Sequence, residues 1–482
     1  SNNSNISGID LLQPRVGFTY KPTPRLTIRG GGGIFGGGSP DVYIGNSFSN
    51  TGVINTSITA RQTDGGIYQL NGSASGTNAT NAASILNNPS FTSIPTAADT
   101  AVVAAANGLT SNPNATTSIN AIDPNFKAPN QFRATLSADY EANLGPLGDG
   151  WRFGADVLYS KVRSQVKVID LRSIPVAGSF TPDGRQRYTS KIGNANDTGQ
   201  DLLLTNTDYG RGWIGVLRAE KTWDWGLTLG GAYTRQDVRD DTSLTSSQAG
   251  SIYGNTAAYD ANLSGPGHSN DEVVWAFRYN ASFERAFFGD YKTRIDLFGS
   301  TRAGARYSYT MQDLSGGRSG VFGTAGSALR YLFYVPTGIN DPKVIYDSTA
   351  TATRIDSIIQ SSGLAGYRGQ VAPRNAFRSK AFTRIDLHLE QEVPLPLGTR
   401  FALFADIENF TNLLNHKWGQ QLRSSFPYRK TIAKVSCVAG TGNTCAQYKY
   451  EQPSSDTVRA DELVTTNGSS LYAIRIGARF SF

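Results

Sequence analysis

The stretch FTRIDLHLEQEV, from Phe382 to Val393, decides the fold. One set of alternate positions is mostly apolar and is interrupted only by Gln391: Thr383, Ile385, Leu387, Leu389 and Val393. The other set is wholly ionisable: Arg384, Asp386, His388, Glu390 and Glu392. Because successive side chains of a β-strand point to opposite faces, this stretch predicts a strand with one apolar face and one ionic face.

The same alternation recurs along the chain. It is clear in 132–140, 275–283, 293–309 and 472–482, and in 293–309 it places Ile295, Leu297, Tyr307 and Tyr309 on the apolar side. Lipid requires an apolar outer face, a wet or plugged lumen tolerates charge, and closure of the sheet pairs every backbone group. The repeated pattern therefore predicts an all-β fold, a transmembrane antiparallel β-barrel.

We expect about eleven strands, separated by connections that alternate in length. The strands are expected at about 13–21, 25–35, 130–142, 151–168, 210–222, 226–239, 273–286, 291–309, 381–393, 400–416 and 470–482. The long connections are about 36–128, 169–208, 241–271, 310–380 and 419–468. Short periplasmic turns opposite long extracellular loops are typical of outer-membrane barrels, and aromatic residues crowd the short turns. Bacterial barrels have even strand numbers, so an odd number predicts that more barrel precedes this chain.

The composition argues against a helical membrane protein and against a nucleic-acid-binding protein. Of 482 residues, 39% are hydrophobic, and no apolar run reaches the roughly 18 to 20 residues of a membrane helix. The net charge of +7 is spread among nearby acidic residues, which argues against nucleic-acid binding. The chain begins at Ser1 without a recognisable leader, so we expect the N-terminal part of an exported protein to lie upstream. Cys437 and Cys445 are close enough for a disulfide in an oxidising compartment, with two free thiols as the alternative.

The candidate functional residues are charged side chains expected to face the lumen and contact a plug. They are Arg294, Asp296, Arg302, Arg384, Asp386, Glu390, Arg400, Asp406, Glu408, Arg475 and Arg479. The three histidines lack metal-ligand spacing, and no Ser/His/Asp or Cys/His arrangement is recognisable, so neither a metal site, a cofactor nor an enzyme is predicted. Gly30 to Gly33 lacks the Lys and the following helix of a phosphate-binding loop, which favours a structural role.

Three segments resemble known sequences. Two of them, Leu11 to Gly37 and Phe382 to Gly419 with its Asn412 to His416 motif, are similar to Oar-like, carboxypeptidase-regulatory-domain-containing TonB-dependent receptors. The third, the terminal LYAIRIGARFSF ending in Phe482, resembles the outer-membrane assembly signal that the BAM machinery reads, and a terminal Phe alone marks only an outer-membrane protein. The resemblance covers the strands well and the connections poorly.

This resemblance implies a 22-stranded barrel in a Gram-negative outer membrane, of which the chain would supply strands 12 to 22. It also implies an N-terminal plug whose TonB box engages TonB–ExbB–ExbD, neither of which can be found in this sequence. The implied function is energised uptake or export, with lipid, lipopolysaccharide and the other half of the barrel as partners. A passive porin-like channel and a structural or adhesive outer-membrane protein are the alternatives. The substrate is not readable from the sequence.

Overall fold

The structure is a computed structural model of the chain. It describes residues 10–37, 40–50, 60–63, 65–70, 73–87, 103, 118–193, 197–260, 262–263, 265–313, 318–326, 329–394, 400–440, 444–452, 463–464 and 469–481. Phe482 and most of the stretch 88–117 therefore lie outside the described residues, and the side chain of Arg400 is likewise outside them. None of the described helices is both long and apolar enough to cross a lipid bilayer.

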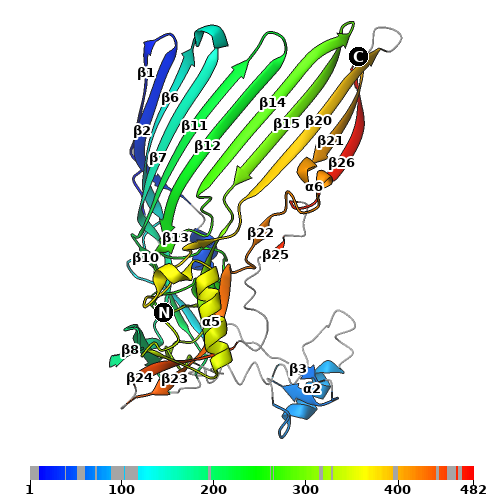
Figure 1. The fold of residues 1–482 in the computed structure, drawn as a ribbon. Coiled ribbons are helices and arrows are strands. Elements are labelled where there is room, and N and C mark those ends of the chain that lie inside the picture. The colour runs from blue at the N-terminus through cyan, green and yellow to red at the C-terminus, as the bar shows by residue number, and fades with distance from the viewer. Residues whose placement is uncertain are drawn as a thin grey trace.

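One antiparallel sheet of long strands dominates the molecule (Figure 1). Its path follows chain order: β1 (Arg15–Thr23), β2 (Leu26–Gly36), β6 (Asn130–Ala142), β7 (Trp151–Asp170), β11 (Gly210–Thr222), β12 (Leu227–Asp240), β14 (Trp275–Phe288), β15 (Tyr291–Arg302), β20 (Phe382–Pro394), β21 (Arg400–Glu408) and β26 (Ala473–Ser481). These eleven strands are the eleven that the alternating pattern predicts. At one end the strands are joined by short turns, including the 3-10 helix η2 (Gly145–Leu147).

Neighbouring strands are paired so that both faces stay consistent across the sheet. Leu136 of β6 lies opposite Val157 of β7, and the next residue, Ser137, lies opposite Asp156. The same holds at the other end, where Asp406 of β21 faces Arg475 and Ile407 faces Ile474. A slip of one residue would move every side chain to the wrong face. The register therefore confirms an apolar face and an ionic face that each continue over all eleven strands.

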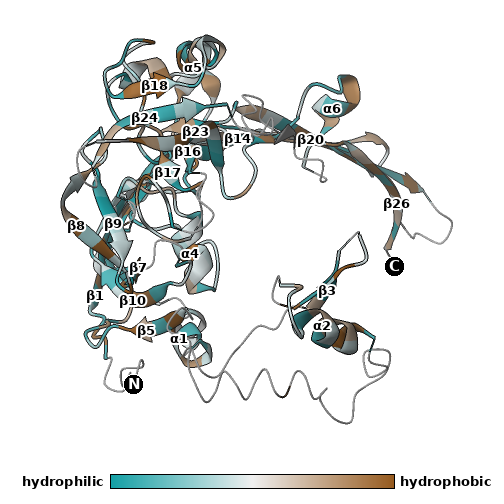
Figure 2. Ribbon diagram, turned by 90° about the horizontal axis from the view of Figure 1, so that it is seen from below, coloured by the Kyte–Doolittle hydropathy of each residue, from teal (hydrophilic) through white to brown (hydrophobic). Residues whose placement is uncertain are grey.

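The apolar face is not a protein core. Leu217 is 62% exposed and Ile476 is 79% exposed, although both lie within paired strands. The sheet itself is an open arc (Figure 2). Among the described residues no backbone pairing joins β1 to β26, so each of these edge strands is paired on one side only.

Glycines mark two places where the sheet needs close approach. A Cβ on Gly31 would lie 2.6 Å from the carbonyl oxygen of Val16, and one on Gly33 would lie 2.4 Å from that of Pro14. The backbone of β1 thus curls tightly over β2, which only glycine permits. Gly299 serves a different purpose, since the ring of Tyr279 covers it on the apolar face.

Two predicted strands are too long. The strand expected at 291–309 ends at Arg302, and β16 (Arg306–Asp313) starts a different sheet after Gly304. Tyr307 and Tyr309, predicted on the apolar barrel face, are buried in a separate core instead. The strand expected at 400–416 ends at Glu408, and α6 (Phe410–Leu414) follows Asn409, whose φ of 50° breaks the strand.

Described segments of three long connections, 169–208, 310–380 and 419–468, fold into a compact unit, here called the lobe. Its main sheet contains β17 (Tyr331–Leu332), β16, β23 (Arg429–Ala439), β24 (Cys445–Glu451) and β18 (Val344–Tyr346), with β19 (Phe377–Arg378) on β16. The hairpin β8 (Ser173–Phe180) and β9 (Gln186–Ser190), helix α5 (Thr349–Ser361) and the 3-10 helix η3 (Leu364–Tyr367) complete it. The pairs β16–β23 and β18–β24 are parallel, whereas the eleven strands along the path of the barrel sheet pair only antiparallel.

Smaller elements line the remaining connections. They are α1 (Pro40–Ser49), β3 (Ala60–Gln62), β4 (Tyr68–Leu70), α2 (Asn78–Leu86), β5 (Ile119–Ile122), β10 (Asp201–Thr207), α4 (Ala249–Asn255), β13 (Gly267–His268), β22 (Leu422–Arg423) and β25 (Leu463–Val464). A second apolar core joins α1, α4, β5 and β10 to the end of β7. Among the described residues, α1, α4, β5 and β10 therefore pack against the end of β7, whereas β3, β4 and α2 form a separate small apolar cluster.

The lobe buries several charged side chains. Arg185 is fully buried, pairs with Asp183 at 2.7 Å and donates to the carbonyl of Leu332 at 2.9 Å. Burial alone would raise the pKa of Asp183, but the adjacent Arg185 outweighs it and holds that pKa below its usual value. Two further buried arginines attach the lobe to the strand ends, because Arg374 binds Asp240 at the end of β12 and Arg306 binds Glu272.

Candidate functional site

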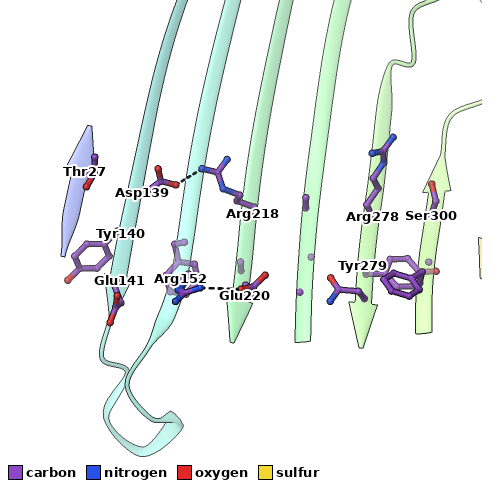
Figure 3. A pocket seen from close by; sticks show the side chains of 18 of the residues that line it. Thr27, Asp139, Tyr140, Glu141, Arg152, Arg218, Glu220, Arg278, Tyr279 and Ser300 are labelled. Atoms are coloured by element: carbon purple, nitrogen blue, oxygen red, sulfur yellow. Dashed lines mark hydrogen bonds and ion pairs between the residues drawn. The ribbon is translucent and has the colours of Figure 1, made fainter. Parts of the chain in front are cut away.

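The ionic face carries a cavity of about 760 Å³ near the short-turn end (Figure 3). It is lined from β2 across to β20, and Figure 3 shows side chains of several strands converging on it. Side chains two strands apart meet here: Arg218 of β11 reaches Asp139 of β6 over Gly154 of β7. Such crowding is the geometry of a concave surface, so we assign the ionic face to the inside of the arc.

Arg218 is the centre of this cavity. Its guanidinium contacts the carboxylates of both Asp139 and Asp156, and Asp139 also accepts from Arg29 at 2.6 Å. Gly154 is required beneath Arg218, because a Cβ there would fall 2.3 Å from Nε. The side chains are between about one third and one half exposed, so water reaches this network. Arg152 and Glu220 form a looser pair at 3.7 Å (Figure 3).

A second ionic cluster occupies the last strands, around a cavity of about 560 Å³. Arg384 of β20 bridges Asp386 at 2.8 Å and Glu408 of β21 at 3.1 Å. Arg479 of β26 reaches Glu390 across β21 at 3.2 Å. The two clusters make a band of opposite charges on the inner wall, interrupted at β12, whose inner positions Gly230, Ala232 and Thr234 are uncharged.

The structure brings most of the predicted residues into this band. Arg294 pairs with Asp296 at 2.7 Å, and Asp406 lies 2.6 Å from His388. Arg475 is held loosely, 3.9 Å from Asp406 and 3.8 Å from Glu408. Arg302 forms no ion pair with a described residue; its guanidinium stacks on Phe382 at 4.8 Å. Whether these residues contact a plug stays a prediction, as does any role of Arg400 or Phe482.

The centre of the larger cavity was missed at the sequence level. Asp156 and Arg218 are not among the residues that the sequence predicts, because apolar residues share the inner face of their strands; Arg278 falls on the polar side of the alternation in 275–283 but is not among the candidate residues either. In β11, the positions that face the inner wall include the apolar residues Ile214 and Val216. The alternation of apolar and ionic residues that is obvious in β20 is therefore hidden in β11. Register would have revealed them, since Asp156 and Val216 are direct partners and Arg218 is two residues further along.

Outside the band, one group of described residues has metal-ligand geometry. Asp237, His268 and Glu272 bring one potential ligand atom each within 4.8 Å of the others. Arg306 lies in the same group, with Nη2 3.1 Å from Nδ1 of His268 and Nε 2.7 Å from Glu272. A guanidinium already supplies the positive charge there, which disfavours a cation. Elsewhere in the lobe, Cys437 and Cys445 are joined by a disulfide.

Comparison with known proteins finds a family model that matches the N-terminal strands and solved structures with weak similarity to most of the chain. Residues 7–147 match a family model described as an outer membrane beta barrel domain. A comparison with curated protein sequences finds no significant match. Among solved structures, similarity is found to the FrpB iron transporter from Neisseria meningitidis, at 10% identity and a TM-score of 0.32 over 83% of this chain. A mutant ferric enterobactin receptor, PfeA, from Pseudomonas aeruginosa gives 8% identity and a TM-score of 0.37 over 91% of this chain.

The chain spans only 35% of the length of the first of these structures and 38% of the second. The matched residues include β1, β2 and β6, the strands that begin the two-faced sheet. Together with an antiparallel sheet that exposes apolar side chains on one face and charges on the other, this match makes the fold an outer-membrane β-barrel fold.

Proposed function

We propose that this chain forms part of the wall of an energised outer-membrane transporter, with no catalytic role, and that its inner ionic band holds a plug reversibly. The observation that carries the proposal is the band itself, which runs from Asp139 and Arg218 to Glu390 and Arg479. A passive channel can use charged walls to select its solutes, but it does not require many ion pairs that can exchange partners. A wall that must bind and release a protein segment does require such exchangeable ion pairs.

The strengths of these pairs suit a reversible seal. The side chains of Arg218 and Asp139 are 41% and 39% exposed, and that of Arg475 is 72% exposed. Ion pairs this exposed contribute only about 0–1 kcal/mol each. A plug carboxylate or amide can therefore exchange with a wall partner at little cost. Arg278, which projects into the cavity (Figure 3) without an ion pair among the described residues, offers a ready contact for a plug carboxylate.

The other partners that we propose follow from the position of this chain in the wall of a barrel. β1 and β26 each have one unpaired edge among the described residues, and an open edge is not tolerated in hydrocarbon. We therefore propose that further strands complete the ring, supplied by the rest of the polypeptide or by another chain. The plug and its coupling to TonB–ExbB–ExbD, assembly by BAM and contact with lipopolysaccharide belong to the proposal. The long connections would then face the cell exterior.

The test uses the complete transporter in cells. Arg294→Ala with Arg384→Ala removes two wall cations that hold Asp296, Asp386 and Glu408. We expect the plug to loosen and permeability to a large antibiotic such as vancomycin to rise. Arg285→Ala, an exposed cation on the outer face of β14, is the matched control and should leave permeability unchanged. Permeability equal to wild type in the double variant would count against the plug contact.

Energy coupling is tested separately. Uptake by an energised importer stops when a protonophore collapses the proton-motive force, whereas a passive channel continues to conduct. Substrate uptake that is insensitive to the protonophore would favour the porin-like alternative.

A further inference from the structure

A row of basic side chains crosses the outer face of the sheet at the end that leads into the long connections. Lys161 of β7 lies directly opposite Arg211 of β11, and Arg211 lies opposite Arg239 of β12. His268 of β13 continues the row beyond Arg239. Like charges that face one another on adjacent strands are destabilising unless an anion compensates them.

Two more cations adjoin this row. Arg235 is two pairs nearer the centre of β12 on the same face, and Arg378 of β19 lies near it. Partial burial lowers the pKa of Arg378, and the positive charges of Arg306 and Arg235 lower it further. Leaving out His268, we call the five lysine and arginine residues of this surface the basic belt: Lys161, Arg211, Arg235, Arg239 and Arg378.

The belt is undercompensated within the described part of the chain. Asp237 binds Arg239 at 3.1 Å and is also 3.5 Å from His268. Lys161, Arg211, Arg235 and Arg378 form no ion pair with a described carboxylate, and all four are exposed. Lys161 makes only a neutral contact, donating to the carbonyl of Asp208 at 3.2 Å. The surface therefore offers several unneutralised cations side by side.

The position of the belt fixes its environment. Tyr159 and Trp213, whose rings pack 4.5 Å apart, are the next outward residues toward the sheet centre, and Trp213 is 49% exposed. Aromatic rings of this kind mark the depth of the lipid headgroups. Arg211 is two residues beyond Trp213, roughly 7 Å further along the strand. Lys161, Arg211 and Arg239 thus lie beyond these rings, at the end of the apolar band, whereas Arg235, opposite Gly215, lies one outward position nearer the sheet centre than Trp213.

We propose that the basic belt binds the phosphate groups of a phosphorylated lipid headgroup in the leaflet on the side of the long connections. Arginine guanidinium groups match phosphate oxygens with paired hydrogen bonds, and Lys161 adds a point charge. The adjacent Tyr159 and Trp213 contact the upper acyl chains. Bound phosphate removes the repulsion along the row and fixes this part of the wall in the membrane. The inference rests on the proposed membrane placement, but not on the plug.

The experiment compares lipid binding by matched variants of the full chain. The chain is prepared as part of the complete transporter in zwitterionic micelles, and bisphosphorylated lipid A or its dephosphorylated form is added. Bound lipid is counted by native mass spectrometry. The variant Lys161→Gln/Arg211→Gln/Arg235→Gln should lower affinity for bisphosphorylated lipid A about a hundredfold, because each basic group near a lipid surface contributes roughly fivefold. Binding of dephosphorylated lipid A should not change.

Arg285→Gln is the matched control, since Arg285 is an exposed outward cation at the opposite end of the apolar band. It should stay within about twofold of wild type, as expected for a charge outside the site. Wild-type affinity in the triple variant, with strand content and micelle insertion intact, would overturn the belt alone. Equal displacement of lipid A by inorganic phosphate would also overturn it, because the site would then recognise a free anion. A chain that stays soluble without detergent would overturn the membrane placement itself.

Discussion

The barrel sheet and the lobe are built from one chain but sort their side chains in opposite ways. In the sheet, Leu217 is 62% exposed while Arg218 beside it is engaged in ion pairs. In the lobe, Phe333 is fully buried and so is Arg185. The lobe buries its apolar residues as a water-soluble domain does. The sheet exposes them, which is stable only where the surrounding medium is hydrocarbon.

The difference teaches where charge contributes to stability. A charge pair withdrawn from water is expensive to separate, because the remaining partner cannot be solvated. A half-exposed pair is readily replaced by water. The lobe therefore uses ion pairs to fix one structure, and the sheet uses them on a surface where contacts can be exchanged.

The largest effect should come from breaking a buried pair in the lobe. Arg185→Met leaves Asp183 buried without its cation and also removes the contact of Arg185 with the Leu332 carbonyl. We expect the free energy of opening of the lobe to fall by about 3–5 kcal/mol. Hydrogen exchange of β16 and β23 measures it. The matched change Arg218→Met in the sheet should cost about 0–1 kcal/mol, so a similar loss at both sites would contradict the contrast.

The next effect tests the two faces of one strand. Leu217→Arg puts a charge midway along β11 on the apolar face, between Trp213 and Trp223. It should destabilise the inserted barrel by about 2–4 kcal/mol, the cost of arginine near the bilayer centre. The neighbouring change Val216→Arg faces the inner wall opposite Asp156 and should be tolerated. Refolding into lipid vesicles measures both, and equal losses would show that the faces are assigned wrongly.

The sequence predicts the sheet far better than the lobe, for a physical reason. A strand between lipid and lumen must alternate at every position, so residues such as Ile385 and Asp386 reveal their faces directly. The lobe is held by contacts between distant segments. Tyr448 of β24 and Arg185 before β9 meet although 263 residues separate them, and no local pattern signals that contact. Tyr307 and Tyr309 continue the alternation of β15 by coincidence, which explains why the strand was predicted too long.

The candidate site divides in the same way. The pairs Arg384–Glu408 and Arg294–Asp296 lie in strands whose opposite face is mostly apolar and whose charges stand at alternate positions, so their residues could be identified from sequence. The triad of Asp139, Asp156 and Arg218 depends on three strands meeting in register over a glycine. Only the pairing of those strands brings it together.

Acid should loosen the lobe before the sheet. The pKa of Asp183 is lowered in the folded state by Arg185, so its stabilising effect is present above the ordinary aspartate pKa of about 3.9. It is lost as pH falls below that value toward the lowered pKa. We expect the protection of lobe amides, measured relative to their intrinsic exchange rates at each pH, to fall below about pH 4, and Asp183→Asn to flatten this dependence. An acid profile unchanged by that substitution would assign the loosening to other groups.

The smallest effect concerns a single pair of the inner wall. A double-mutant cycle on Arg384→Ala and Glu408→Ala isolates their contact, which is 3.1 Å long with side chains 26% and 43% exposed. The coupling energy should be about 0.2–1 kcal/mol and should shrink as salt is added. Arg384 also holds Asp386, so the single Arg384→Ala change should cost more than the coupling alone. A coupling energy as large as that of a buried ion pair would mean that the inner wall is bonded too strongly to exchange partners with a plug. The contrast between sheet and lobe would then not hold for the charged residues on which the proposed function depends.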